Sequence, residues 1–156
     1  MVDKNAVPEA EELDAEECWK LLRETGVGRL GVIADGRPDI FPVNYKVDGN
    51  SVVFLTGTGT KTRAIEEDAA VALEADAVSA EFGMAWSVIV KGKAIGNSST
   101  EQTLDAVSRA LFPWQGAGKD LLFRIVPDSV TGRRYTVTTD MRWRVGVDDA
   151  SRAGME

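Results

Sequence analysis

The chain has 156 residues, enough for one domain, and its 44% hydrophobic and 28% charged residues are typical of a globular protein. Its net charge of −7 argues against nucleic acid or an anionic membrane surface as the main partner. Because no apolar run is long enough to span a membrane and the acidic N-terminus lacks a signal-peptide pattern, we expect a cytoplasmic protein that binds neither nucleic acid nor membrane.

The chain contains no histidine and one cysteine, Cys18. Histidine is the commonest metal ligand and the usual general base near neutral pH, so its absence excludes a Ser-His-Asp triad and histidine-ligated zinc or haem. A single cysteine excludes an internal disulfide and a multi-cysteine metal site, and it fits a reducing compartment. Any enzymatic chemistry is therefore expected to come from a bound organic cofactor, with no metal.

The N-terminal region predicts a flexible tail followed by a helix. Residues 1–12 are acidic and lack periodicity, which is typical of a tail. Asp14-x-x-Glu17 then has the spacing of a capping box, and Gly26 is a typical helix stop. Between them one apolar face has helical spacing and consists of Cys18, Leu21, Leu22 and Thr25. This position favours a packing role for Cys18 over a role as a nucleophile.

Three short strands are expected next, at residues 29–34, 40–47 and 51–55. Residues 35–38 (Asp-Gly-Arg-Pro) and 48–50 (Asp-Gly-Asn) are turn sequences, so the three strands predict an antiparallel meander. Alternate residues of the second strand form one apolar face, which consists of Phe41, Val43, Tyr45 and Val47.

The rest of the chain continues with short elements. We expect, in order, a helix at 61–68, a strand at 70–75, an irregular loop at 76–84, a strand at 86–95, a helix at 100–111, strands at 121–126 and 133–138, and a flexible tail at 148–156. Gly92, inside the long strand, indicates a bulge or the close approach of another segment. Together these elements predict a mainly β fold, a small antiparallel β-barrel with flanking helices, formed by one domain over residues 13–147.

The stretch from residue 53 to residue 67 carries the clearest ligand signal. A buried strand is followed by alternating Thr and Gly from Thr56 to Thr60, and then by the cations Lys61 and Arg63 at the start of a helix. Free N–H groups and the helix dipole at such a terminus suit a phosphate. The spacing matches neither a Walker A motif nor a Gly-x-Gly-x-x-Gly fingerprint. The alternative is a turn capped by a hydroxyl.

Four segments in this order resemble the pyridoxamine 5′-phosphate oxidase-like split β-barrel family: residues 28–38, 42–45 (Pro-Val-Asn-Tyr), the Thr/Gly stretch to Lys61, and 86–92. The similarity covers residues 13–137 and is greatest to the small flavin-binding branch that includes nitroimidazole-resistance-type proteins. It implies an FMN-binding split β-barrel that forms a homodimer with two flavin mononucleotide (FMN) sites at the subunit interface. The phosphate would lie near Lys61 and Thr62, with three possible hydroxyl donors: Thr56, Thr58 and Thr60.

The resemblance also implies contacts to the flavin ring. The segment Pro42, Val43 and Asn44 would run beside the isoalloxazine, and Pro42, which lacks an N–H, predicts an edge or bulged position. Ser87 corresponds to a polar position near the flavin. Trp143 would reach the partner's flavin, as C-terminal residues do in the larger oxidases. Asn44 is alternatively an ordinary exposed strand residue. Trp86 is expected in the core or at the dimer interface.

The positions at which the sequence departs from the family pattern reduce the number of activities that we expect. The chain lacks a convincing copy of the C-terminal segment through which pyridoxamine phosphate oxidases hold pyridoxal phosphate, and the histidines of nitroimidazole-resistance and haem-degrading relatives. Our first hypothesis is a flavin-dependent oxidoreductase of unknown substrate, reduced by a nicotinamide or another small molecule. The alternatives are a non-catalytic flavin carrier, a ligand-free dimer, or a protein that uses the deazaflavin F420, whose anionic tail would follow Lys61, Arg63, Lys91 and Lys93.

Overall fold

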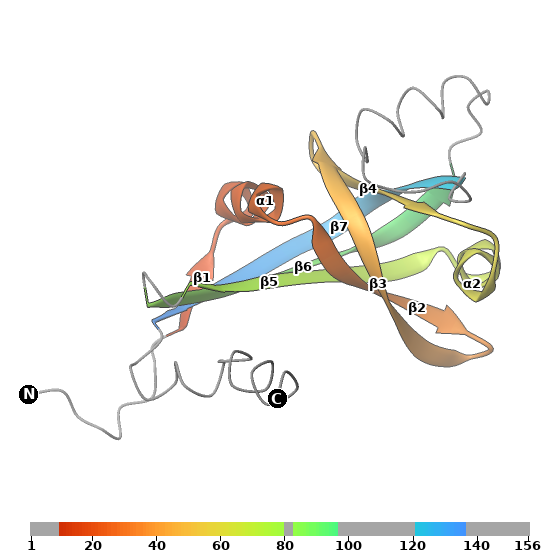
Figure 1. Cartoon of the computed structure of the whole chain (residues 1–156), viewed down its shortest axis with the longest axis horizontal. Coiled ribbons are helices and arrows are strands. Elements are labelled where there is room, and N and C mark those ends of the chain that lie inside the picture. The colour runs from red at the N-terminus through yellow and green to blue at the C-terminus, as the bar shows by residue number, and fades with distance from the viewer. Residues whose placement is uncertain (1–9, 80–82, 97–120, 137–156) are drawn as a thin grey trace, which may run out of the picture.

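The computed structural model describes residues 10–79, 83–96 and 121–136 (Figure 1). This part of the chain forms seven strands and two helices: β1 (Ala10–Leu13), α1 (Ala15–Glu24), β2 (Val27–Ala34), β3 (Arg37–Asp48), β4 (Ser51–Thr56), α2 (Thr60–Glu67), β5 (Ala70–Ser79), β6 (Met84–Gly96) and β7 (Leu121–Thr136). None of the helices in these ranges is long and apolar enough to cross a membrane. The predicted helix at 100–111 and the tail at 148–156 lie outside the described residues.

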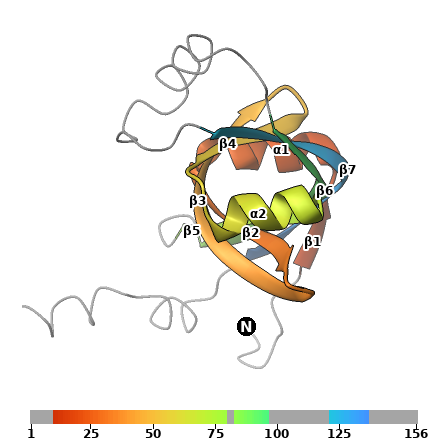
Figure 2. The same cartoon turned by 90° about the vertical axis from the view of Figure 1, so that its right-hand side faces the viewer.

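The strands close into an antiparallel barrel. Their order is β1-β7-β4-β3-β2-β5-β6, and an additional pairing of β6 with β7 joins the two sides. Figure 2 shows the resulting ring of strands, with α2 lying across its near end. The predicted mainly β, antiparallel split-barrel fold is confirmed. The predicted meander is also confirmed, because β2 pairs with β3 and β3 with β4 in antiparallel register.

Helix α1 forms for the reason that the sequence indicates. The Asp14 side chain caps it by accepting a hydrogen bond from the Glu17 N–H at 2.9 Å, and the helix ends before Thr25. Its buried face consists of Cys18, Trp19, Leu21 and Leu22. Cys18 is fully buried, so the expected packing role is confirmed. Burial, together with the carboxylates of Asp14 and Glu17, raises the pKa of this thiol and keeps it protonated.

Tyr45 joins α1 to the barrel. Its ring is fully buried, and its hydroxyl donates to the Leu22 carbonyl at 2.8 Å and is hydrogen-bonded to the Thr25 hydroxyl. Burial raises the pKa of Tyr45, so its hydroxyl remains a donor at neutral pH. The expected apolar face of β3 is also observed, because Val43 and Tyr45 are buried while Phe41 and Val47 pack partly buried against the core.

Strand β4 is the most completely buried strand. All its residues from Val52 to Thr56 are buried, so both of its faces are covered. Phe54 stacks on Phe123 of β7 at a centroid distance of 5.6 Å. The Thr/Gly stretch therefore starts from a fixed point in the barrel wall.

Several boundaries differ from the sequence expectation, and the clearest cases are the N-terminal tail and the loop between β5 and β6. The tail was expected to reach residue 12, whereas Ala10–Leu13 forms β1 and pairs with residues 132–135 of β7. The loop expected at 76–84 is shorter, because β5 continues to Ser79 and β6 begins at Met84. In both places the strands extend because a partner strand supplies hydrogen bonds to residues with little intrinsic β propensity.

The largest correction concerns the last two strands. We expected separate strands at 121–126 and 133–138, but residues 121–136 form the single strand β7. Pro127, Asp128 and Gly132 read as strand breakers in the sequence. The pairing with β6 accommodates Pro127 because the register shifts between Lys91–Ser129 and Gly92–Pro127, where Asp128 is the extra residue.

Gly92 is required at this bulge. A Cβ atom at position 92 would lie 2.0 Å from the Val126 carbonyl oxygen, far inside van der Waals contact. The predicted close approach of another segment is thus confirmed, and the segment is the β7 backbone.

We therefore expect Gly92→Ala to lower the free energy of unfolding by about 2–3 kcal/mol, since the backbone of one strand must move. Gly96→Ala in the same strand is the matched control, because its Cβ would meet only the Phe123 ring at 3.5 Å. Urea unfolding followed by circular dichroism measures both. Equal stability of the two variants would contradict the assignment of this bulge.

Candidate functional site

The Thr/Gly stretch lies between the fixed end of β4 and the start of α2. Thr56 is the last residue of β4, and α2 begins at Thr60. Gly59 is the N-cap residue and supplies no side-chain hydrogen bond to the helix. The first N–H groups of α2 therefore lack the side-chain acceptor that Ser, Thr, Asp or Asn would provide, which leaves them available to an anion.

Two threonine hydroxyls converge on one backbone carbonyl. The Thr62 hydroxyl donates to the Gly57 carbonyl oxygen at 2.9 Å, and the Thr56 hydroxyl donates to the same oxygen at 3.2 Å. Both threonines are buried, with exposed fractions of 6% and 4%. Thr58 and Thr60, in contrast, are exposed. Of the threonines expected near a phosphate, two thus have hydroxyls bonded within the protein and two face solvent.

Lys61 connects this loop to β3. Its ammonium lies over the ring of Phe41, 5.4 Å from the ring centroid, within the range of a cation–π interaction. Because Lys61 is in the first turn of α2, this contact places a positive charge at the helix N-terminus. Lys61 is half-buried, so part of the side chain remains accessible to solvent.

The edge of β3 next to this contact is unpaired within the described ranges. From Arg37 to Asn44 the strand pairs with β2 on one side, and β4 joins its other side only from Tyr45 onward. Pro42 is exposed on this segment, which agrees with the expected edge position. Val43 is buried and Asn44 half-buried. Phe41, which contacts Lys61, is followed directly on this strand by residues 42–44, and their role as flavin contacts stays a prediction.

Ser87 lies away from Lys61 and the β3 edge. It pairs with Asp76 of β5 and Arg133 of β7, and it lines a hollow of about 410 Å³ together with residues of β1, β6 and β7. Strand β1 and helix α2 lie at opposite ends of the molecule in Figure 1. Within one subunit the structure therefore does not bring Ser87 and Lys61 together. Trp114 and Trp143 lie outside the described residues, so the place of Trp143 remains a prediction.

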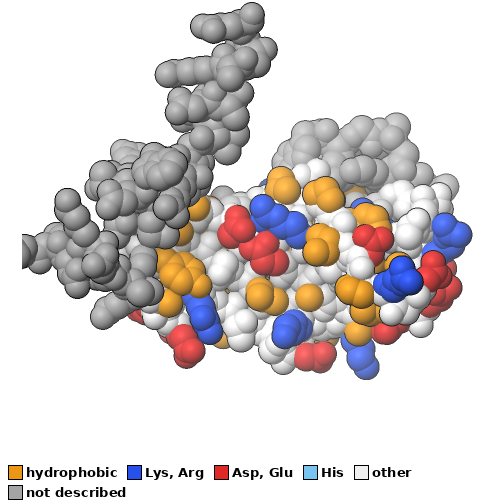
Figure 3. All heavy atoms as spheres, turned by 90° about the horizontal axis from the view of Figure 1, so that it is seen from below, with side chains coloured by type: hydrophobic (Ala, Val, Ile, Leu, Met, Phe, Trp, Pro, Cys, Tyr) orange, Lys and Arg blue, Asp and Glu red, His pale blue; other side chains and the backbone are white. Residues whose placement is uncertain are grey.

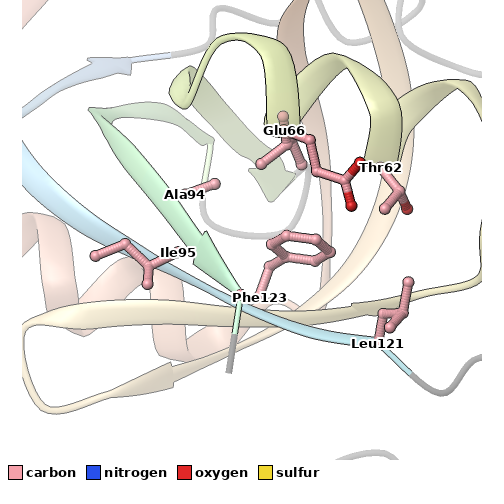
Figure 4. Close-up of a pocket in the computed structure, with 8 residues that line it drawn as sticks. Thr62, Glu66, Ala94, Ile95, Leu121 and Phe123 are labelled. Carbon is pink, nitrogen blue, oxygen red and sulfur yellow. The ribbon is translucent and has the colours of Figure 1, made fainter. Parts of the chain in front are cut away.

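A second hollow lies under α2 and was not foreseen from the sequence (Figure 4). It has a volume of about 500 Å³ and is lined by Thr62, Ile65, Glu66, Ala94, Ile95, Gly96, Leu121 and Phe123. The described residues make its walls largely apolar, and among them the carboxylate of Glu66 is the one charged group. The register of β6 and β7 creates it by placing Gly96 opposite Phe123, and no local sequence pattern signals that pairing.

The outward surface of the sheet carries a cluster of charges among apolar side chains. Arg29 Nη1 lies 3.1 Å from Glu74 and 3.3 Å from Asp76. Burial and the neighbouring Asp76 raise the pKa of Glu74, an effect that Arg29 opposes. In register, Pro42 pairs with Arg29, Arg29 with Glu74, and Glu74 with Ile89. Figure 3 shows a face of the molecule on which hydrophobic side chains alternate with charged ones.

No group of three or more His, Cys, Asp or Glu in the described part of the chain is arranged to hold a metal ion. The fold and this loop together define a class of protein. It is an antiparallel split barrel in which the N-terminus of a helix, a place that suits an anion, lies beside a strand edge that is unpaired within the described residues. The sequence of residues 14–134 matches the family described as pyridoxamine 5′-phosphate oxidase. The chain belongs to this family.

Three relatives illustrate the similarity. The chain is 34% identical over 131 residues to the uncharacterized protein Rv0080 of Mycobacterium tuberculosis, covering 81% of this chain and 86% of that protein. It is 34% identical to the FAD binding protein from Mycobacterium smegmatis, with a TM-score of 0.65 over 80% of this chain and 97% of that one. An FAD-binding protein from Mesorhizobium loti, at 24% identity, has a TM-score of 0.71 over 83% and 98% of the two chains, which supports the fold alone.

Proposed function

We propose that this protein binds a flavin by its ribityl phosphate, with FMN as the ligand, at the N-terminus of α2. The observation that carries the proposal is the uncapped start of α2, at which the Lys61 ammonium is held over Phe41. Free helix N–H groups and a cation in the first turn attract a phosphate even though the protein carries a net charge of −7, because a small anion responds to the local field. The FAD-binding relative that is 34% identical supports a flavin, since FMN and FAD share the phosphate on the ribityl chain.

Each residue of the site has a different part in this proposal. Lys61 and the backbone N–H groups at the start of α2 would hold the phosphate, and the exposed hydroxyls of Thr58 and Thr60 would complete its hydrogen bonds. The unpaired edge at residues 42–44 would offer backbone groups to the polar edge of the ring. Val43 is buried, so it would contribute through its backbone, whereas the half-buried Asn44 would also offer its amide.

We propose further that the protein is a flavin-dependent oxidoreductase. A bound flavin supplies hydride and electron transfer, so the protein needs no histidine for this chemistry. The chain's own residues would bind and orient the flavin. The substrate class is open, and a nicotinamide or another small molecule would serve as reductant.

The proposed partner is a second copy of the chain. Strongly exposed apolar residues occur on the outward surface of the sheet, among them Ile40 at 67% and Val27 at 57% exposure. Ile40 pairs with Gly31, two residues along β2 from the Arg29 cluster, so the apolar and charged groups share one face. Clusters of this kind are typical of surfaces that bind other proteins. A homodimer across this face would also bring Ser87 of one subunit close to the flavin of its partner.

The direct test is flavin binding by the purified protein. Excess FMN is expected to produce a bound flavin absorption band and to raise the melting temperature, because a ligand at one hundred times its Kd stabilises the native state by about 2.7 kcal/mol. Parallel titrations with FAD and F420 compare the other cofactors, and reduction by NADH or NADPH distinguishes an enzyme from a flavin carrier. A protein that binds none of the three would refute the proposal.

Lys61→Ala should weaken FMN binding by about 1.5–3 kcal/mol, the range for a charge-assisted contact, and leave riboflavin binding nearly unchanged. Riboflavin has no phosphate, so the ratio of the two dissociation constants isolates the contact at the phosphate. Lys20→Ala is the matched control, because it removes an exposed lysine from α1. Equal losses for both flavins would mean that Lys61 does not contact the phosphate.

Ile40→Asp is expected to shift the protein from dimer to monomer at micromolar concentration, since it places a charge in the proposed apolar contact. Val126→Asp is the control, because Val126 is also exposed, at 44%, but lies on β7 opposite Lys93. Sedimentation equilibrium measures both variants. A monomeric wild type, or an Ile40→Asp variant that stays dimeric, would argue against this interface.

A further inference from the structure

We propose that Thr62 is a positioning residue, which orients the Gly57–Thr58 peptide so that its N–H, and not its carbonyl, faces the anion site. This inference rests on the proposed phosphate site and changes the expected part of Thr62 within it. The resemblance implied that Thr62 would lie near the phosphate. The structure instead shows its hydroxyl directed at the Gly57 carbonyl.

The hydrogen bonding leaves Thr62 little capacity for a ligand. A threonine hydroxyl has one proton to donate, and that of Thr62 is 2.9 Å from the Gly57 carbonyl oxygen. The side chain is 6% exposed. Thr56, 4% exposed, donates to the same oxygen at 3.2 Å. The carbonyl is thereby held on the buried side of the loop, from two directions.

The orientation of this carbonyl determines where the next N–H points. The peptide bond between Gly57 and Thr58 is trans, as are the other described peptide bonds. In a trans peptide the C=O and N–H vectors are antiparallel and lie in one plane. Since the Gly57 carbonyl points toward the buried Thr62, the Thr58 N–H points away from it. Thr58 is exposed, so this donor faces the solvent side of the loop, where an anion can approach.

The loop needs such a constraint because its own sequence is permissive. Gly57 and Gly59 have no Cβ, so a peptide flip beside them meets little steric resistance. A flip would exchange a donor for an acceptor and would present the partial negative charge of a carbonyl to a phosphate. Thr62 lies in the first turn of α2, which also carries Lys61. Its hydrogen bond therefore fixes the orientation of the peptide relative to that helix terminus.

The test compares Thr62→Val, which keeps the shape but removes the hydroxyl, with Thr62→Ser, which keeps the hydroxyl. Dissociation constants for FMN and riboflavin are measured by flavin fluorescence for both variants and for the wild type. We expect Thr62→Val to weaken FMN binding by about tenfold or more, the effect of one lost charge-assisted hydrogen bond, with riboflavin changed less than about twofold. Thr62→Ser should retain the wild-type preference for FMN.

Three results would overturn the proposal: a Thr62→Val variant with wild-type FMN affinity, equal losses for FMN and riboflavin, or a Thr62→Ser variant as weak as Thr62→Val. Failure of the parent proposal is distinguishable, because a wild type that binds FMN no more tightly than riboflavin has no phosphate site for Thr62 to organise.

A second measurement does not depend on the folding of a variant. In the wild-type protein, the backbone amide resonance of Thr58 should shift on titration with FMN and with inorganic phosphate, and much less with riboflavin. A Thr58 amide that responds equally to FMN and riboflavin, or to neither, would contradict the orientation inferred for this peptide.

Discussion

The pairing of β7 with strands on both of its sides is the interaction on which the rest of the structure depends. Without the β6–β7 ladder the sheet would have two long open edges, and the core residues of β4 and β6 would lie at a surface. The ladder runs the full length of β6 only because Gly92 lets the two backbones approach and the bulge accommodates Pro127. The end of the barrel that α2 covers exists because this closure holds.

Much of the fold was predictable where local and tertiary signals agree. The Asp14 N-cap, the turns after β2 and β3, and the alternation in β3 each have a short-range physical cause, and the structure shows these three features. In place of the second half of the expected capping box, the Glu17 carboxylate accepts a hydrogen bond from Arg134. The continuity of β7 was not predictable, because Pro127 and Gly132 are unfavourable in a strand by themselves. Only the partner strands, far away in the sequence, make a strand there favourable.

The candidate site, like the fold, was predictable from the sequence only in part. Lys61 contacts Phe41, the residue that precedes 42–44 on β3, and no spacing rule in the sequence predicts this contact. The hydroxyls of Thr56 and Thr62 could not be assigned from sequence, since a buried donor and a ligand donor have the same residue type. Ser87 shows a further limit: a sequence can place a residue in a family motif without showing whether it lies beside the other residues of the candidate site.

The burial of β4 on both faces has a consequence for how this family can vary. Every residue from Val52 to Thr56 is covered, so the wall that carries the loop is set by core packing, and a change there disturbs the whole barrel. The residues immediately after it, 57–60, are partly or fully exposed, and among them Gly57 is tied to that packing by its carbonyl, which accepts from Thr56 and Thr62. Substitutions at the exposed residues 58–60 are therefore expected to disturb the barrel less than substitutions in β4, so the sequence of this loop can vary while the barrel stays the same.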